Sequence, residues 1–187
     1  MDYRAMRRIL KELKDEEKIN ELLSTAKVGY LGLYDEEGTY VVPLNFVWKD
    51  NKIYFHGSEQ GRKIDAINSN HRICFTVSED NGTVAHPYPA EIGTAYISVM
   101  VFGSVRKVES LEETTAALQA MLDKFVPGYF ASDLSQKYVN SYRSSMGSKT
   151  IVYCIDPDQI TAKEDTADSS EMFYHGRKQV DDLKNNK

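Results

Sequence analysis

Alternation of apolar and polar positions in the first half of the chain predicts three strands. These runs cover residues 27–34 ("KVGYLGLY"), 39–48 ("TYVVPLNFVW") and 52–56 ("KIYFH"). The turn-rich segments "DEEG" and Asp50-Asn51 separate them. Three antiparallel strands in a meander are therefore expected.

Helical spacing of apolar residues marks three further segments. A short amphipathic helix is expected over Asp15–Leu23, and a second over Arg62–Ser69, where Ile64 and Ile67 are spaced for one face. Ser110 and Glu113 form an S-x-x-E capping box at the start of a third helix, which Pro127-Gly128 ends.

The second half of the chain adds strands at residues 72–78, 95–109 and 149–156, with Gly103 marking a bulge or a close backbone approach. Residues 79–94, rich in turn signals, are expected to form a long irregular link. Six mostly antiparallel strands with interposed helices predict an α+β, mainly β protein built on a small barrel. Residues 1–160 form this domain, and 161–187 form a polar C-terminal tail, either a solvated end or an arm packed on a partner subunit.

Length and net charge limit the number of domains and the classes of binding partner. The 187 residues fit one domain, and the net charge of -5 argues against nucleic acid as a partner. The N-terminus lacks the apolar core of a secretory signal, and no apolar run is long enough to cross a bilayer. A cytoplasmic protein without a membrane partner is expected.

The spacing of the cysteine and histidine residues does not indicate a metal site. Cys74 and Cys154 lie in apolar runs, where a reduced thiol behaves as a small buried hydrophobe, and no C-x-x-C spacing occurs. His71 and Cys74 form an H-x-x-C, but zinc needs about four converging ligands and no companions are evident.

The strand-to-helix corner "FHGSEQGRK" carries the clearest candidate chemistry. Ser58, Arg62 and Lys63 offer a hydroxyl, a guanidinium fork and a point charge within one turn, which suits a phosphate monoester. The plainer alternative is a solvated loop beside a basic helix start. Cations at a helix N-terminus oppose the helix dipole, and a bound anion removes that conflict.

In this strand order, "VPLNF", "YFHGSEQGRK" and "YISVMVFGSV" together resemble the pyridoxamine 5'-phosphate oxidase-like split barrels that bind FMN. Within these the chain is most similar to the nitroimidazole-resistance (Nim) group, from about Lys27 to Phe125. The resemblance implies a six-stranded split β-barrel that forms a homodimer with two FMN sites at the subunit interface. The residues it places at the cofactor are Pro43, Leu44, Asn45, Phe46, His56, Gly57, Ser58, Arg62, Lys63 and Ser98.

The resemblance also distinguishes roles among these residues. It implies main-chain contacts from Pro43–Phe46 beside the flavin ring, phosphate binding by Ser58, Arg62 and Lys63, and an approach by Ser98 from the same or the partner subunit. Ile97 stands where the group often has arginine, so a charge contact is absent there or comes from elsewhere.

Three of these positions keep alternatives open. Pro43 within a strand implies an edge, a strand start or a bulge. Asn45, between two apolar residues, faces either solvent on the opposite barrel side or the pyrimidine edge of a flavin. His56 suits a structural histidine, a phosphate ligand or a proton donor, and is the candidate catalytic residue.

The favoured interpretation is an FMN-dependent oxidoreductase that acts on a small planar molecule, with nitroaromatics such as 5-nitroimidazoles implied by the resemblance alone. No G-x-G-x-x-G fingerprint occurs, so NAD(P)H would act as a transient electron donor. The alternatives are a non-catalytic flavin-binding or redox-sensing protein, and a split barrel that uses haem or a deazaflavin.

Overall fold

The computed structural model describes residues 6–142 and 150–185. In chain order the elements are η1 (Ile9–Lys11), α1 (Glu16–Thr25), β1 (Val28–Asp35), β2 (Gly38–Asn45), β3 (Val47–Lys49), β4 (Lys52–Gly57), α2 (Arg62–Ser69), β5 (Arg72–Val84), η2 (Pro89–Glu91), β6 (Gly93–Lys107), α3 (Leu111–Phe125), α4 (Gln136–Ser141), β7 (Ile151–Asp165) and α5 (Gln179–Asn185).

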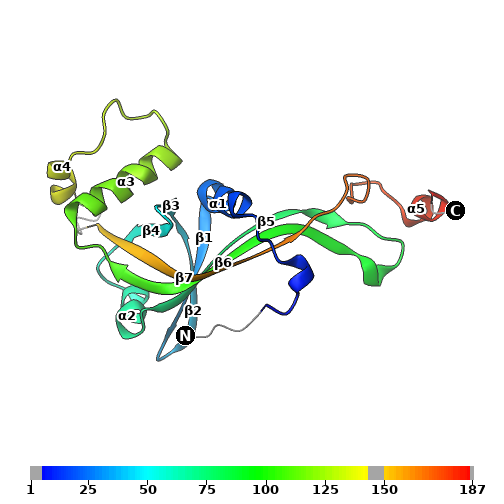
Figure 1. The fold of residues 1–187 in the computed structure, drawn as a ribbon, viewed down its shortest axis with the longest axis horizontal. Helices are drawn as coiled ribbons and strands as arrows, with labels where there is room; N and C mark the ends of the chain where they lie inside the picture. Colours follow the sequence, from blue (N-terminus) through cyan, green and yellow to red (C-terminus); the bar gives the residue numbers. More distant parts are fainter. Residues whose placement is uncertain (1–5, 143–149, 186–187) are drawn as a thin grey trace.

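The strands form one antiparallel sheet in the order β2-β1-β5-β6-β7-β4-β3 (Figure 1). Its two end strands, β2 and β3, are consecutive in the chain and are joined by the single residue Phe46, so the sheet curls back on itself. The mainly β split-barrel class predicted from the sequence is confirmed. The count is seven rather than six because the strand expected over residues 39–48 divides at Phe46.

The predicted meander of the first three strands holds only in part, because its second strand divides and the third strand pairs with the final piece of the second. β1 and β2 form the expected hairpin, but β4 pairs with β3 and with β7, and not with β2. Phe46 is fully buried against Phe75, with ring centroids 4.9 Å apart. The chain therefore turns inward at Phe46 and carries β3 and β4 to the opposite end of the sheet.

β5, β6 and the end of β7 extend beyond the barrel as a long arm, on which the C-terminal segment lies (Figure 1). Half of the irregular link expected over residues 79–94 is strand, because β5 continues to Val84, which pairs with Gly93. The final strand runs to Asp165, past its expected end at residue 156. Met172 then bridges to Val84, and the amide of Phe173 donates to the carbonyl of Thr83.

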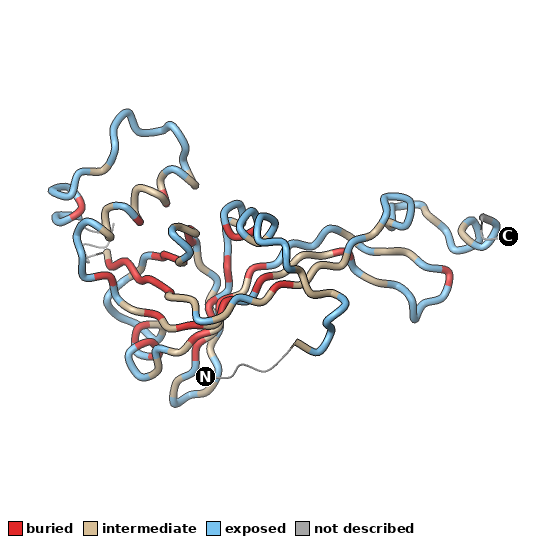
Figure 2. Tube along the Cα trace, in the orientation of Figure 1, coloured by how far each residue is buried: buried red, intermediate tan, exposed pale blue. Residues whose placement is uncertain are grey.

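Buried residues concentrate in the barrel, whereas the arm beyond it is largely exposed (Figure 2). β1 alternates inward Leu31 and Leu33 with outward Tyr30 and Tyr34, as the pleat requires. Cys154 is a fully buried free thiol, as expected, whereas Cys74 is only partly buried and lies on the face of β5 opposite to Ile73 and Phe75.

Close backbone packing at Gly103 confirms the expectation for that residue. The β6–β7 register shifts between Phe102 and Gly103, and a Cβ atom at Gly103 would lie 2.2 Å from the carbonyl oxygen of Asp156. Only glycine fits such a contact without movement of the backbone.

The helices begin where the sequence signals them. The Asp15 side chain accepts from the amides of Glu17 and Lys18 at the start of α1, and the Ser110 hydroxyl accepts from the amide of Glu113 at the start of α3. α1 buries Leu22 and Leu23 against the sheet. None of the helices in the described ranges is long and apolar enough to cross a membrane.

Candidate functional site

The corner between β4 and α2 brings most of the predicted phosphate ligands together. β4 ends at Gly57, and α2 begins after Gly61, whose φ of 107° is a conformation that favours glycine. α2 has no side-chain cap at its N-terminus. Its first amide groups therefore point to a place where an anion is stabilised.

Lys63 is the cation of this corner that lacks a charged partner. Its Nζ lies over Gly57, where a Cβ atom would approach it to 2.9 Å, and 5.4 Å from the centroid of the Phe55 ring. Lys63 makes no ion pair with a described residue, and burial lowers its pKa. A bound anion would supply the missing counter-charge.

Arg62 has a different environment. Its Nε and Nη2 donate to the two carboxylate oxygens of Asp35, at 2.8 and 3.1 Å, and its guanidinium lies 4.6 Å from the centroid of the Tyr40 ring. Glu37 adds a further contact to Nη1 at 3.4 Å. The pair with Arg62 lowers the pKa of Asp35. Arg62 thus ties α2 to the β1–β2 hairpin.

An aromatic pair in β4 and β7 packs beside the corner and hydrogen-bonds to it. The rings of Phe55 and Tyr153 stack with centroids 5.3 Å apart, and the Tyr153 hydroxyl donates to the carbonyl oxygen of Ser58 at 3.3 Å. The Ser58 hydroxyl accepts from the amide of Gln60 and stays exposed to solvent. Its remaining hydrogen-bonding capacity is available to a ligand.

His56 lies at the end of β4 with one side of its ring in solvent and the other against α3. Its Nδ1 is 3.2 Å from the sulfur of Met121. Burial of the packed side, and secondarily the charge of Lys63, lower the pKa of His56. The imidazole is therefore neutral at pH 7.

Pro43–Phe46 form the end of β2 and the residue after it, and β2 is an end strand of the sheet. Of the three alternatives left open for Pro43, the structure has the edge strand. Leu44 and Phe46 pack on the core, while Pro43 and Asn45 are exposed on the outer face. The outer edge of β2 leaves main-chain groups unpaired in the sheet, which suits contacts with the amide edge of a planar ligand.

Ser98 is distant from the corner within one chain. It pairs with Lys163, twelve residue steps along β7 from Ile151, which pairs with Gly57. At 3.3 Å per residue the extended path along β7 is at most about 40 Å. Pro43 and Met100, by contrast, belong to one row across the sheet, Pro43-Tyr30-Thr76-Met100-Thr161, so the outer face joins β2 to the region of Ser98.

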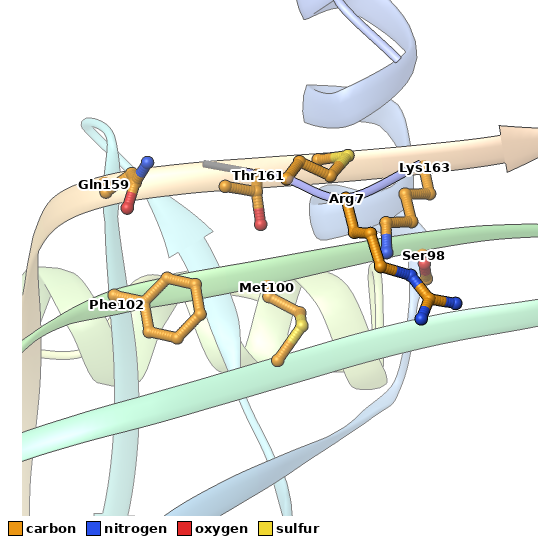
Figure 3. A pocket seen from close by; sticks show the side chains of 8 residues that line it. Arg7, Ser98, Met100, Phe102, Gln159, Thr161 and Lys163 are labelled. Atoms are coloured by element: carbon orange, nitrogen blue, oxygen red, sulfur yellow. The ribbon is translucent and has the colours of Figure 1, made fainter. Parts of the chain in front are cut away.

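Ser98 lines a cavity of about 340 Å³ between β6, β7 and the N-terminal segment. Figure 3 shows Arg7 and Lys163 on the same side as Ser98, with Met100 and Phe102 farther along. Neither cation makes an ion pair with a described residue. Ile97 packs against the core on the opposite face, while Arg7 and Lys163 bring positive charge to the Ser98 side of the sheet. Sequence reasoning missed both, because neither lies near the motif in the sequence.

A comparison with models of protein families agrees with the split-barrel fold. Residues 15–164 match the family model described as pyridoxamine 5'-phosphate oxidase. The chain belongs to the pyridoxamine 5'-phosphate oxidase family. A search of curated proteins gives no match.

Solved structures of this fold include three with broad coverage. The flavocytochrome Anf3 from Azotobacter vinelandii has 21% identity and a TM-score of 0.73, over 89% of this chain and 77% of that one. A FAD and heme binding protein from Mycobacterium smegmatis has 20% identity and a TM-score of 0.68, over 86% and 78%. At these identities the likeness shows the fold alone.

A third structure agrees with the narrower resemblance seen in the sequence. A putative 5-nitroimidazole antibiotic resistance protein from Bacteroides thetaiotaomicron VPI-5482 has 26% identity and a TM-score of 0.63, over 81% of this chain and 85% of that one.

Proposed function

We propose that the protein is an FMN-dependent oxidoreductase whose cofactor phosphate binds at the corner between β4 and α2. The observation that carries the proposal is Lys63, a half-buried ammonium without a carboxylate partner among the described residues, beside the uncapped start of α2 and the Ser58 hydroxyl. A phosphate monoester carries close to two negative charges at pH 7 and would pair with all three groups. The residues present at the corner fit such a group.

The flavin ring is proposed to lie along the free edge of β2, beside Pro43–Phe46. Arg62, in contact with Tyr40 of β2, shows that the corner and this strand adjoin in one chain. Asn45 is exposed and makes no side-chain hydrogen bond with a described residue, so its amide is free to meet the pyrimidine edge.

A second copy of the chain is proposed to complete the site. The outer face of the sheet exposes large apolar side chains, among them Tyr30, Val41 and Met100. Such a face is typical of a surface that another protein covers. Since the extended path along β7 from the corner to Ser98 is up to about 40 Å, Ser98 is proposed to approach the cofactor of the partner subunit.

The substrates are proposed to be small planar acceptors, including nitroaromatics such as 5-nitroimidazoles, with NAD(P)H as a transient electron donor. Support comes from the similar fold of the putative 5-nitroimidazole antibiotic resistance protein. The flavin supplies the redox chemistry, taking up hydride and passing it on. Lys63 and Ser58 would hold the phosphate and β2 would orient the ring, whereas His56 faces α3 and the cavity beside it.

The visible absorption spectrum of the purified protein tests this proposal first. A flavin spectrum, with FMN identified chromatographically after heat release at about one equivalent per chain, is the expected result. FAD, haem or a deazaflavin would replace FMN in the proposal. A colourless protein that also fails to bind added FMN would overturn it.

The reaction is tested on the flavin-loaded protein. Anaerobic NAD(P)H is expected to bleach the flavin absorption, and a 5-nitroimidazole is expected to restore it. A flavin that NAD(P)H reduces but a nitroaromatic fails to reoxidise would remove that substrate class. A flavin that no donor reduces would point to a binding protein without turnover.

A further inference from the structure

A cavity of about 570 Å³ lies between the end of β4 and the α3–α4 region, apart from the phosphate corner. Its walls come from His56 of β4, from α3, from α4 and from the loop between the two helices. Cavities of this size commonly hold small molecules. None of Ser58, Arg62 and Lys63 lines it, so the cavity is separate from the proposed phosphate ligands.

Most of the lining is apolar or aromatic. α3 contributes Leu118, Met121 and Leu122, and the α4 side contributes Tyr138 and Tyr142, whose rings are 5.8 Å apart. Phe130, on the loop, is 55% exposed although it lines the cavity. Large apolar side chains left in water around a hollow gain free energy when an apolar molecule covers them.

His56 gives the cavity one well-defined polar contact. A thioether sulfur only accepts hydrogen bonds, so the contact between Nδ1 and the Met121 sulfur, 3.2 Å long, assigns the proton to Nδ1. The lowered pKa of His56 agrees with a neutral ring. Nε2 then carries a lone pair, and no described residue donates to it.

The formal charge of the described lining residues disfavours anions. Asp133 is the one residue with a formal charge among those that line the cavity in the described chain, since His56 is neutral. We propose that this cavity binds a neutral aromatic molecule with a single hydroxyl or N–H group, which donates a hydrogen bond to Nε2 of His56. The ring lies among the α3 and α4 side chains.

The test uses the full-length protein as purified and two matched probes, 4-fluorophenol and fluorobenzene, followed by fluorine NMR. The two differ in the hydroxyl group alone. 4-Fluorophenol is expected to bind saturably and at least fivefold more tightly than fluorobenzene, because only it satisfies Nε2. In His56→Phe this preference is expected to fall to less than twofold.

A second variant tests the location. Leu122→Trp fills the cavity and is expected to weaken both probes at least tenfold. Leu111→Trp, on the same helix but outside the cavity, serves as its control and is expected to leave both unchanged. Absence of saturable binding, an equal affinity for both probes, or binding that Leu122→Trp leaves intact would each overturn the proposal.

Flavin content, read from the absorption spectrum of the same samples, separates the two proposals. Probe binding in a colourless protein would leave the cavity proposal standing and count against the flavin. A flavin-loaded protein that binds neither probe would do the reverse.

Discussion

Arg62 and Asp35 form a bidentate ion pair that joins the start of α2 to the end of β1 at the β1–β2 turn. Such forked geometry fixes the guanidinium plane. The adjacent Lys63 has no such partner among the described residues and lies half-buried over Gly57. Of two neighbouring cations that look equivalent in the sequence, one is therefore committed to the fold and the other is available to an anion.

Lys63→Met is accordingly expected to weaken FMN binding at least tenfold. A hydrogen bond between charged groups contributes about 1.5–3 kcal/mol, and about 1.4 kcal/mol corresponds to a tenfold change. Quenching of FMN fluorescence on titration with the cofactor-free protein measures the affinity. Lys49→Met, which removes a lysine already paired with Asp50 at 3.3 Å, is the control. Equal affinities in the two variants would refute the phosphate assignment.

The substitution Asp35→Asn tests whether Arg62 can also bind the FMN phosphate. The substitution removes a negative charge beside the corner and releases the guanidinium, so FMN affinity is expected to stay the same or rise a few-fold. The same titration measures it. A tenfold loss of affinity would show instead that the Arg62–Asp35 pair positions α2 for binding.

Sequence reasoning located the corner well because its signals are local. The helix Arg62–Ser69 follows from Ile64 and Ile67 spacing, and the observed bounds agree with the prediction. The pairing of β4 with β7 had no such signal, since the two strands are about a hundred residues apart and register is set by burial in the closed sheet.

The cavity beside His56 was also beyond sequence reasoning. It needs Met121 of α3 and the six-residue helix α4, which is too short for a clear apolar period. Ser135, whose hydroxyl accepts from the amide of Tyr138, was the one available signal for α4. The extension of β5 through the turn-rich residues 79–84 was missed because pairing with β6 overrides local propensity.

Gly103→Ala is expected to destabilise the fold by about 1–3 kcal/mol or more, because the added Cβ would meet the backbone of Asp156 and not a movable side chain. Urea unfolding followed by circular dichroism measures the change. Gly93→Ala, where the nearest atom would be 3.9 Å from the added Cβ, is the control on the same strand and is expected to change little. Similar effects at both positions would contradict the close approach of β6 to β7.

Glu113 connects α3 to the barrel and makes stability depend on pH. It accepts from Arg106 at 2.6 Å and from the Tyr54 hydroxyl at 3.0 Å, and the pair with Arg106 is the main cause of its lowered pKa. A depressed carboxylate pKa stabilises the fold above the unfolded-state value and loses that effect as pH falls through the folded-state value.

Glu113→Gln is therefore expected to lower the free energy of unfolding by about 1–2 kcal/mol at pH 7. This is less than for a fully buried ion pair, because solvent partly screens the pair with Arg106. The difference from the unsubstituted protein should shrink as the pH falls below 4.5, the ordinary pKa of the group. Urea unfolding at a series of pH values measures it. Glu112→Gln, in the same helical turn, is the control. A cost that persists unchanged at pH 3 would exclude the ionised pair as its source.

The outer face of the sheet is the proposed contact between two copies of the chain. Tyr30 and Met100 lie in one row of that face and are 47% and 40% exposed. Stable interfaces bury about 800 Å² on each partner, and their centres exclude unpaired charge. Tyr30→Glu combined with Met100→Glu is expected to convert a dimer to a monomer, measured by light scattering after size-exclusion chromatography.

Tyr129→Glu provides the matched control, because Tyr129 is 78% exposed on the loop after α3 and outside the sheet. It is expected to remain dimeric. Because the partner subunit is proposed to complete the cofactor site, the monomeric variant is also expected to lose flavin while its circular dichroism spectrum is unchanged. A monomeric parent protein, or a folded monomeric variant that retains flavin at full affinity, would show that one chain holds the cofactor alone.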